Sequence, residues 1–171
     1  MRLYLFLLII FLFKTVYPVF AESTYVLPYP AAMPGNPFYK VSFISEKIKK
    51  YWNFGDYGAF KYNLAYSDKY LVEAKTLFEY KQYLLAQNAL LKSNIYFREA
   101  KFSIDSAQKN KKPVTHLKDI YKNASEKHEE VLEQLKSDTP PTFLWTPEDG
   151  QKQLLRIHEV LNEAISIRIH E

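Results

Sequence analysis

Two neighbouring stretches of this sequence carry apolar residues at helical spacing on two separate faces, and this pattern limits the possible folds more than any other feature. In residues 59–80, one face is formed by Phe60, Leu64, Leu71, Ala74 and Phe78, and a second by Tyr62, Tyr66, Tyr70 and Leu77. In residues 84–108, the two faces are formed by Leu84, Leu91, Ile95 and Phe102 and by Ala86, Leu90, Phe97, Ala100 and Ile104. A helix that is apolar on two sides packs on two sides. We therefore expect two central helices, joined by the short Lys81-Gln82 turn as an antiparallel hairpin.

Three further helices are expected around this hairpin. Asn36 followed by Pro37 is a typical helix start. The residues that follow it at helical spacing are Val41, Ile44, Ile48 and Trp52. They predict a first helix from about Pro37 to Trp52. Pro113 begins another helix that runs to about Lys136 and has a single apolar face, formed by Leu117, Ile120, Tyr121, Ala124, Val131 and Leu135.

The last helix is predicted from a start signal near residue 146. Thr146 and Pro147, followed by two acidic residues, fit a capping residue, a first-turn proline and a favourable helix dipole. Its expected buried stripe is Leu154, Ile157, Leu161, Ala164 and Ile165. No segment shows sustained period-two alternation. The predicted fold class is all-α, an antiparallel bundle of about five helices that forms one domain over residues 37–171.

The first 21 residues have the layout of a secretory signal peptide. Met1-Arg2 gives a positive end, residues 3–13 are an unbroken apolar run, and the −3 and −1 positions suit a cut before Glu22. The alternative is an uncleaved membrane anchor, which needs about 20 apolar residues. Lys14 interrupts the run, so we favour cleavage. The protein is then exported, either secreted or in the cell envelope, without stable membrane insertion after cleavage.

Composition narrows the possible partners. The 171 residues include no cysteine, which excludes a disulfide scaffold, a thiolate metal site and a cysteine nucleophile. Because Arg2 and Lys14 lie in the expected signal peptide, its removal leaves 21 basic residues against 19 acidic ones. A nearly neutral chain gives no support for binding to nucleic acid. A domain of about 150 residues buries about 70% of its unfolded surface, so core packing can stabilise it without disulfides.

Residues 22–36 form a proline-rich arm before the first helix. The prolines fix their own φ angles and restrict the residues before them, so the arm is expected to be extended. Because Leu27, Tyr29 and Phe38 are apolar, we expect a strap that lies in a groove of its own bundle. The alternative is an extended segment that is offered to a partner.

Three segments carry a resemblance to a known family. They are residues 27–39, which contain Leu-Pro-Tyr-Pro and Met-Pro-Gly-Asn-Pro-Phe-Tyr, residues 65–74 (AYSDKYLVEA) and residues 127–132 (KHEEVL). Together they resemble a bacterial family of exported helical proteins with no assigned function. Ala31 stands where that family usually has glycine. The resemblance implies export and a helical bundle, and it brings no catalytic residues.

The stripe of Tyr62, Tyr66 and Tyr70 is the candidate ligand or partner face. Aromatic rings offer flat apolar area with a polar tip, which exported proteins can use to hold sugars or peptides. The alternative is a second packing face against the first or last helix, and the two-faced pattern of both central helices favours it.

Histidines raise the possibility of a metal site. Residues 158–162 resemble the helical zinc-protease motif, but Asn162 replaces its second histidine, and the segment at 128–132 has Leu132 at that position. The motif needs two imidazoles one turn apart, so neither copy predicts a peptidase. If the last two helices are antiparallel neighbours, His128 and His158 could still approach each other and bind a metal ion. Otherwise each histidine packs at the margin of the core.

Catalytic patterns are weak in this sequence. It has no glycine-flanked serine and no glycine-rich phosphate loop, and its four glycines fall in expected turns or caps. We therefore expect a non-catalytic, exported binding or structural module of the cell envelope, without a cofactor. Its expected partner is an envelope protein or a cell-wall component. The alternative is an extracytoplasmic metal-binding or metal-sensing helical bundle.

Overall fold

A computed structural model describes residues 24–30, 33–34, 36–148 and 150–170 of the chain. The expected signal peptide, residues 1–21, lies outside the described residues. The described elements are α2 (Pro37–Trp52), α3 (Gly55–Glu79), α4 (Tyr83–Lys109), α5 (Thr115–Asp138), β1 (Phe143–Trp145), β2 (Gln153–Leu155) and α6 (Ile157–His170). The prediction of an all-α bundle is confirmed, with a small two-stranded sheet added.

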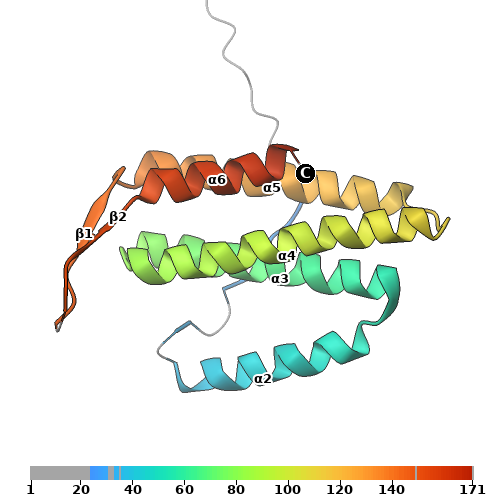
Figure 1. The fold of residues 1–171 in the computed structure, drawn as a ribbon, viewed down its shortest axis with the longest axis horizontal. Helices are drawn as coiled ribbons and strands as arrows, with labels where there is room; N and C mark the ends of the chain where they lie inside the picture. Colours follow the sequence, from blue (N-terminus) through green and yellow to red (C-terminus); the bar gives the residue numbers. More distant parts are fainter. Residues whose placement is uncertain (1–23, 31–32, 35, 149, 171) are drawn as a thin grey trace, which may run out of the picture.

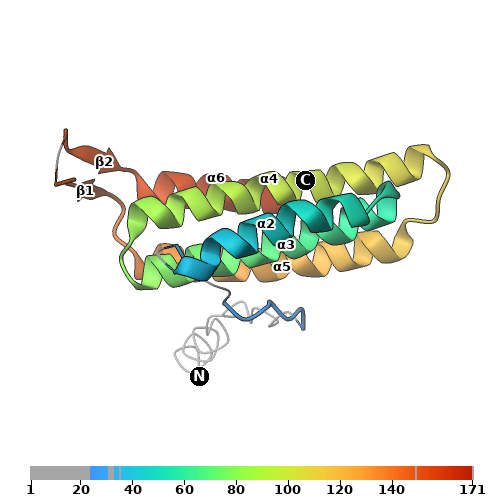
Figure 2. The same cartoon turned by 90° about the horizontal axis from the view of Figure 1, so that it is seen from below.

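The helices form three layers. Figures 1 and 2 show α5 and α6 in one layer, α3 and α4 in the middle, and α2 on the far side of the middle pair, over α3. The position of α3 between the two outer layers explains why its sequence is apolar on two faces. Among the described residues, no helix is long and apolar enough to cross a membrane.

The main core lies between the middle layer and the α5–α6 layer. The face of α3 that contains Leu71 and Ala74 packs with Ala86 and Leu90 of α4 and with Leu132 of α5. The predicted single face of α5 is buried or half-buried as expected. Four of the five residues expected in the last helix's buried stripe are buried in α6: Ile157, Leu161, Ala164 and Ile165.

Local signals explain the ends of α2 and α3. The Asn36 side chain accepts a hydrogen bond from the Phe38 amide at 2.9 Å, and Pro37 occupies the first turn. The corner after α2 is tight, because a Cβ at Gly58 would lie 2.8 Å from the carbonyl carbon of Asn53. Glycine therefore lets α3 begin directly against the end of α2, which fixes how α2 returns along the bundle.

The predicted start of the last helix is wrong. Thr146 and Pro147 lie in the loop of a β-hairpin, and α6 begins only at Ile157. The two strands are antiparallel, with Phe143 opposite Leu155, so Leu154 lies in β2, where its side chain is exposed. Proline and acidic residues also favour turns, so the local helix-start signal did not distinguish the two structures.

Two predicted apolar stripes are not packing faces. The stripe of α2 that contains Val41, Ile44, Ile48 and Trp52 is 50–78% exposed. On α4, Leu91, Ile95 and Phe102 are 46–65% exposed, so the prediction that this helix is covered on both sides is wrong. The outer layer explains the difference on α4, because α2 lies over α3 and leaves this face of α4 open (Figure 2).

The described part of the arm is only partly a strap. Leu27 and Met33 are half-buried against the main core, and Tyr25 packs on the cluster around Phe60. Tyr29 and Phe38, in contrast, are exposed. The arm is therefore held at its beginning and near its end, while two of the three residues that suggested a strap face outward.

Candidate functional site

Helix α2 contacts the bundle around the buried carboxylate of Glu46, and we call this contact the seat of α2. Glu46, the one acidic residue in the sequence of α2, is buried on the face that meets α3. The Tyr70 hydroxyl donates to its Oε2 at 2.7 Å and the Tyr96 hydroxyl to its Oε1 at 2.5 Å. The Tyr62 hydroxyl donates to the backbone carbonyl of Glu46 at 3.2 Å, and the Lys69 ammonium lies 3.4 Å from Oε2. A polar network therefore anchors the amphipathic helix.

Four rings form the floor of this seat, and we call them the tyrosine cluster: Tyr62, Tyr66, Tyr70 and Tyr96. Tyr70 and Tyr96 are stacked, with ring centroids 5.7 Å apart and an angle of 6° between their planes. Tyr62 and Tyr66 lie 4.5 Å apart. The Tyr70–Tyr96 pair joins α3 to α4, and both ring pairs add to the energy of area burial.

Two lysines and a second carboxylate surround the cluster. The ammonium groups of Lys69 and Lys92 each lie 4.9 Å from the centroid of the Tyr70 ring, within cation–π range. The Tyr39 hydroxyl of α2 donates to Oε1 of the buried Glu73 at 3.0 Å. The carboxylates of Glu46 in α2 and of Glu73 in α3 thus both accept hydrogen bonds from tyrosine hydroxyls.

Burial sets the protonation of these groups. It raises the pKa of Tyr70 and of Tyr96, and the hydrogen bond to Glu46 raises each further. Burial is also the main cause that raises the pKa of Tyr66 to about 12, and it raises the pKa of Glu73. At neutral pH these tyrosines are protonated hydrogen-bond donors, which suits them to hold a carboxylate and not to act as bases.

An open groove of about 620 Å³ runs beside α2, and we call it the α2–α4 groove. Tyr70 and Tyr96 of the tyrosine cluster reach its wall, and Ile95 and Phe102 of α4 add apolar area. Charged groups of both signs, such as Lys92, also contribute to the lining. A concave surface with apolar walls and a few polar groups is the usual form of a binding site.

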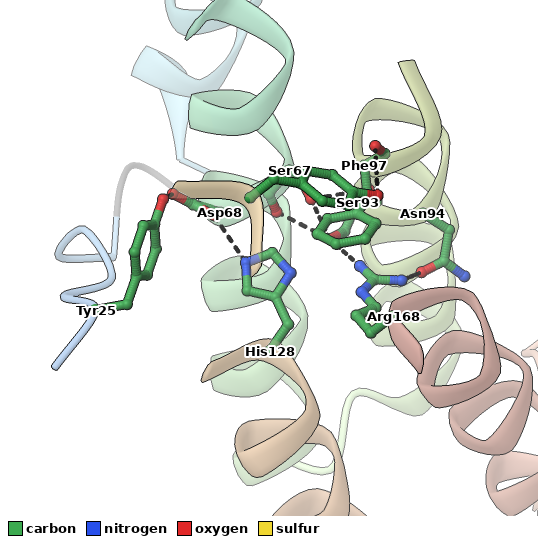
Figure 3. A network of polar contacts seen from close by, with 9 residues as sticks. Tyr25, Ser67, Asp68, Ser93, Asn94, Phe97, His128 and Arg168 are labelled. Atoms are coloured by element: carbon green, nitrogen blue, oxygen red, sulfur yellow. Dashed lines mark hydrogen bonds and ion pairs between the residues drawn. The ribbon is translucent and has the colours of Figure 1, made fainter. Parts of the chain in front are cut away.

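A second polar network lies on the opposite side of α3 (Figure 3). The His128 Nε2 of α5 is 2.7 Å from Oδ1 of Asp68, and the Tyr25 hydroxyl of the arm donates to Oδ2 at 2.7 Å. His128 is fully buried and burial lowers its pKa. The neutral imidazole then donates from Nε2 to the carboxylate. The network ties the arm, α3 and α5 together.

Arg168 fastens α6 to α4 in the same region. Its guanidinium donates to the Asn94 side chain and, at 2.9 Å, to the Ser93 hydroxyl, and it lies 4.7 Å from the centroid of the Phe97 ring. Two reciprocal hydrogen bonds cross the contact between α3 and α4. The Ser67 hydroxyl donates to the Ser93 carbonyl oxygen, and the Ser93 hydroxyl donates to the Ser67 carbonyl oxygen. Small residues let the two helices approach closely here.

A comparison with known protein families shows which family the chain matches. Residues 31–142, about two thirds of the chain, match the family described as a domain of unknown function, DUF5667. The chain belongs to the DUF5667 family. No curated protein and no solved structure matches it. The DUF5667 match includes α2 to α5, and therefore the seat of α2 and the whole tyrosine cluster, whereas the hairpin and α6 follow it.

Within the DUF5667 segment, the predicted tyrosine face is covered. Tyr62, Tyr66 and Tyr70 are 6%, 9% and 1% exposed. In this conformation the stripe is a packing face under α2, which is the alternative that the two-faced helix pattern favoured. Among the described residues, Tyr70 borders the α2–α4 groove, and Tyr62 and Tyr66 border a smaller hollow of about 300 Å³.

The two candidate metal-binding histidines are not brought together. The Nε2 of His158 donates to the Thr139 carbonyl oxygen at 2.9 Å, beyond the end of α5. Thr139 is eleven residues from His128, which is about 16 Å along a helix axis. No group of three or more possible histidine or carboxylate ligands occurs among the residues that the structure describes.

Sequence reasoning missed two central members of the candidate site, Glu46 and Tyr96. A single glutamate in an otherwise basic amphipathic helix was a usable signal, because a helix with several lysines leaves its one acid available for an internal partner. Tyr96 had no comparable signal. It follows Ile95 on a helix whose apolar residues occupy two faces, and only the seating of α2 makes it part of the cluster.

Proposed function

We propose that this DUF5667 chain is an exported, non-catalytic module of the cell envelope that acts by binding a partner. The signal-peptide layout of residues 1–21 and the resemblance to bacterial exported helical proteins support export. The observation that carries the binding role is the α2–α4 groove, an open hollow of about 620 Å³. The partner is an envelope protein or a cell-wall component.

The groove's chemistry suits a peptide or a glycan fragment. Aromatic side chains with a polar tip, here Tyr70 and Tyr96, hold flat or extended ligands well. Ile95 and Phe102 supply apolar area, and Lys92 supplies a donor for a carboxylate. Groups of both signs near apolar walls favour a ligand that has both polar and apolar parts over a simple ion.

The test is thermal unfolding of residues 22–171, which include every described element, with soluble peptidoglycan fragments, envelope-derived peptides or zinc added. A ligand at 100 times its Kd stabilises a protein by about 2.7 kcal/mol. We expect a glycan or peptide fragment to raise the Tm of the parent protein. Ile95→Ser/Phe102→Ser should abolish that increase without lowering the Tm of the free protein, since both side chains are exposed.

A matched control removes exposed apolar side chains from another part of the surface. Leu144 and Leu154 face each other in the hairpin and are similarly exposed, so Leu144→Ser/Leu154→Ser should leave the ligand effect unchanged. An equal Tm increase in the groove variant would place the ligand outside the groove. An increase with zinc alone, lost on substitution of His128 or His158, would favour the metal-binding alternative.

A further inference from the structure

Helix α2 presents a large apolar face to solvent. We call it the outer face of α2, and its members are Phe38, Val41, Ile44, Ile48, Tyr51 and Trp52. All six side chains are at least half exposed. Soluble domains rarely leave a contiguous apolar patch of this kind without a partner. The seat around Glu46 explains how the patch arises, because the polar face of the helix is the one that is buried.

The charge on the solvent side of α2 has one sign. Lys47, Lys49 and Lys50 are exposed, whereas Glu46 is buried against tyrosine hydroxyls. The surface of α2 therefore combines lysines with apolar and aromatic side chains. This is the composition of helices that lie in a membrane interface, with tryptophan and tyrosine at the depth of the headgroups.

We propose that α2 binds the surface of an anionic lipid bilayer, with its outer face in the interface and its lysines among the headgroups. The helix lies parallel to the membrane and does not cross it. A second copy of this chain is a poorer occupant, since a symmetric contact through α2 would bring the lysines of both copies together. An anionic surface instead complements them. The proposal concerns lipid alone, so it does not depend on the ligand of the α2–α4 groove.

The test measures binding of residues 22–171 to vesicles. This segment excludes the apolar run of residues 3–13, which could itself bind lipid. Vesicles of phosphatidylcholine alone are compared with vesicles that contain phosphatidylglycerol as well. We expect strong binding only to the anionic vesicles, weaker binding as salt is raised, and a blue shift of Trp52 fluorescence in a Trp145→Phe background.

Three variants locate the binding face. Ile44→Ser/Ile48→Ser should reduce partitioning at least tenfold, and Lys47→Gln/Lys49→Gln/Lys50→Gln should reduce it on the order of a hundredfold. Leu144→Ser/Leu154→Ser removes similarly exposed apolar area from the hairpin and should bind like the parent. Because all these side chains lie at the surface, circular dichroism should show the same helicity for every variant.

Three results would overturn the proposal. One is no binding of the parent to anionic vesicles at low salt. Another is equal binding by the parent and both α2 variants, which would place lipid contact on another surface. The third is a dimer in sedimentation that the Ile44→Ser/Ile48→Ser substitutions dissociate, which would show that a second copy covers the outer face of α2.

Discussion

At the scale of single residues, the seat of α2 depends on hydrogen bonds to the buried carboxylate of Glu46, which is 4% exposed. The partners of Glu46 are the hydroxyls of Tyr70 and Tyr96, which donate to it, and the Lys69 ammonium at 3.4 Å. Each matters because a buried charge without partners is strongly unfavourable. The rings contribute apolar area as well, so hydroxyl and ring have separate roles. Substitution of tyrosine by phenylalanine removes the hydroxyl and keeps the ring.

We predict that Tyr70→Phe lowers the free energy of unfolding by about 1–3 kcal/mol, because one donor to a buried carboxylate is lost. Urea unfolding measures the change. Tyr80→Phe is the matched control, since the Tyr80 side chain is 72% exposed, and it should change stability by less than about 0.5 kcal/mol. Equal effects for the two variants would mean that the hydrogen bond from Tyr70 to Glu46 adds nothing to stability.

His128 should make stability depend on pH. Burial lowers the pKa of the folded imidazole below its ordinary value of 6.5, so folding disfavours the protonated form. The neutral imidazole therefore contributes its full share of stability above the pKa that His128 has in the unfolded chain. This share is lost as the pH falls from that value through the lower pKa of the folded state. His128→Gln keeps a donor for Asp68 but does not titrate. Between pH 7 and pH 5, the parent should lose more stability than this variant in urea titrations, and parallel curves would refute the assignment.

At the scale of elements, a buried cation links α6 to α4, in addition to the apolar stripe that α6 buries in the main core. Arg168 reaches α4 through Asn94 and Ser93 and lies over the Phe97 ring. Because α6 follows the segment that matches DUF5667, this side chain is a major link between the matched segment and the C-terminal helix. The sequence alone gave no sign of this role, since arginines near helix ends are usually solvated.

We predict that Arg168→Ala lowers the free energy of unfolding by about 3 kcal/mol, because two buried polar side chains lose their partner and a cavity opens beside Phe97. Arg156→Ala is the comparison. Arg156 lies 3.2 Å from Glu159 in an exposed ion pair, and such pairs contribute about 0–1 kcal/mol. Chemical denaturation of both variants tests the difference, and similar small losses would show that Arg168 does not anchor α6.

Element prediction from the sequence succeeded where apolar residues recur at helical spacing, whether or not the structure buries that face. The bounds of α2, the α3–α4 hairpin and the apolar face of α5 all follow from the spacing of apolar residues and from Asn36 and the prolines. The start of α6 failed because Thr146-Pro147 fits a hairpin loop as well as a helix cap. Strands of three residues are too short to show a period of two.

At the scale of the whole molecule, apolar spacing predicts that a helix has an apolar face but not whether a neighbouring helix covers that face. The tyrosine stripe of α3 is covered and the Leu91–Phe102 stripe of α4 is not, although both have helical spacing. The difference comes from the position of α2, which Glu46 and Tyr39 fix through polar contacts. Hydrogen bonds between residues far apart in the chain leave no periodic trace, so the candidate site could be predicted only in part.

The central claim is that α2 is seated by its polar face and presents its apolar face to solvent. The chain has no cysteine, so a single introduced thiol reports its own exposure. Maleimide labelling of Ile44→Cys and Ile48→Cys, at low protein concentration and without lipid, should approach the rate of a free thiol. Ala74→Cys, at a fully buried position, should react only on unfolding. Protection of residues 44 and 48 comparable to that of residue 74 would contradict the claim, because it would mean that α2 packs on the bundle through its apolar stripe.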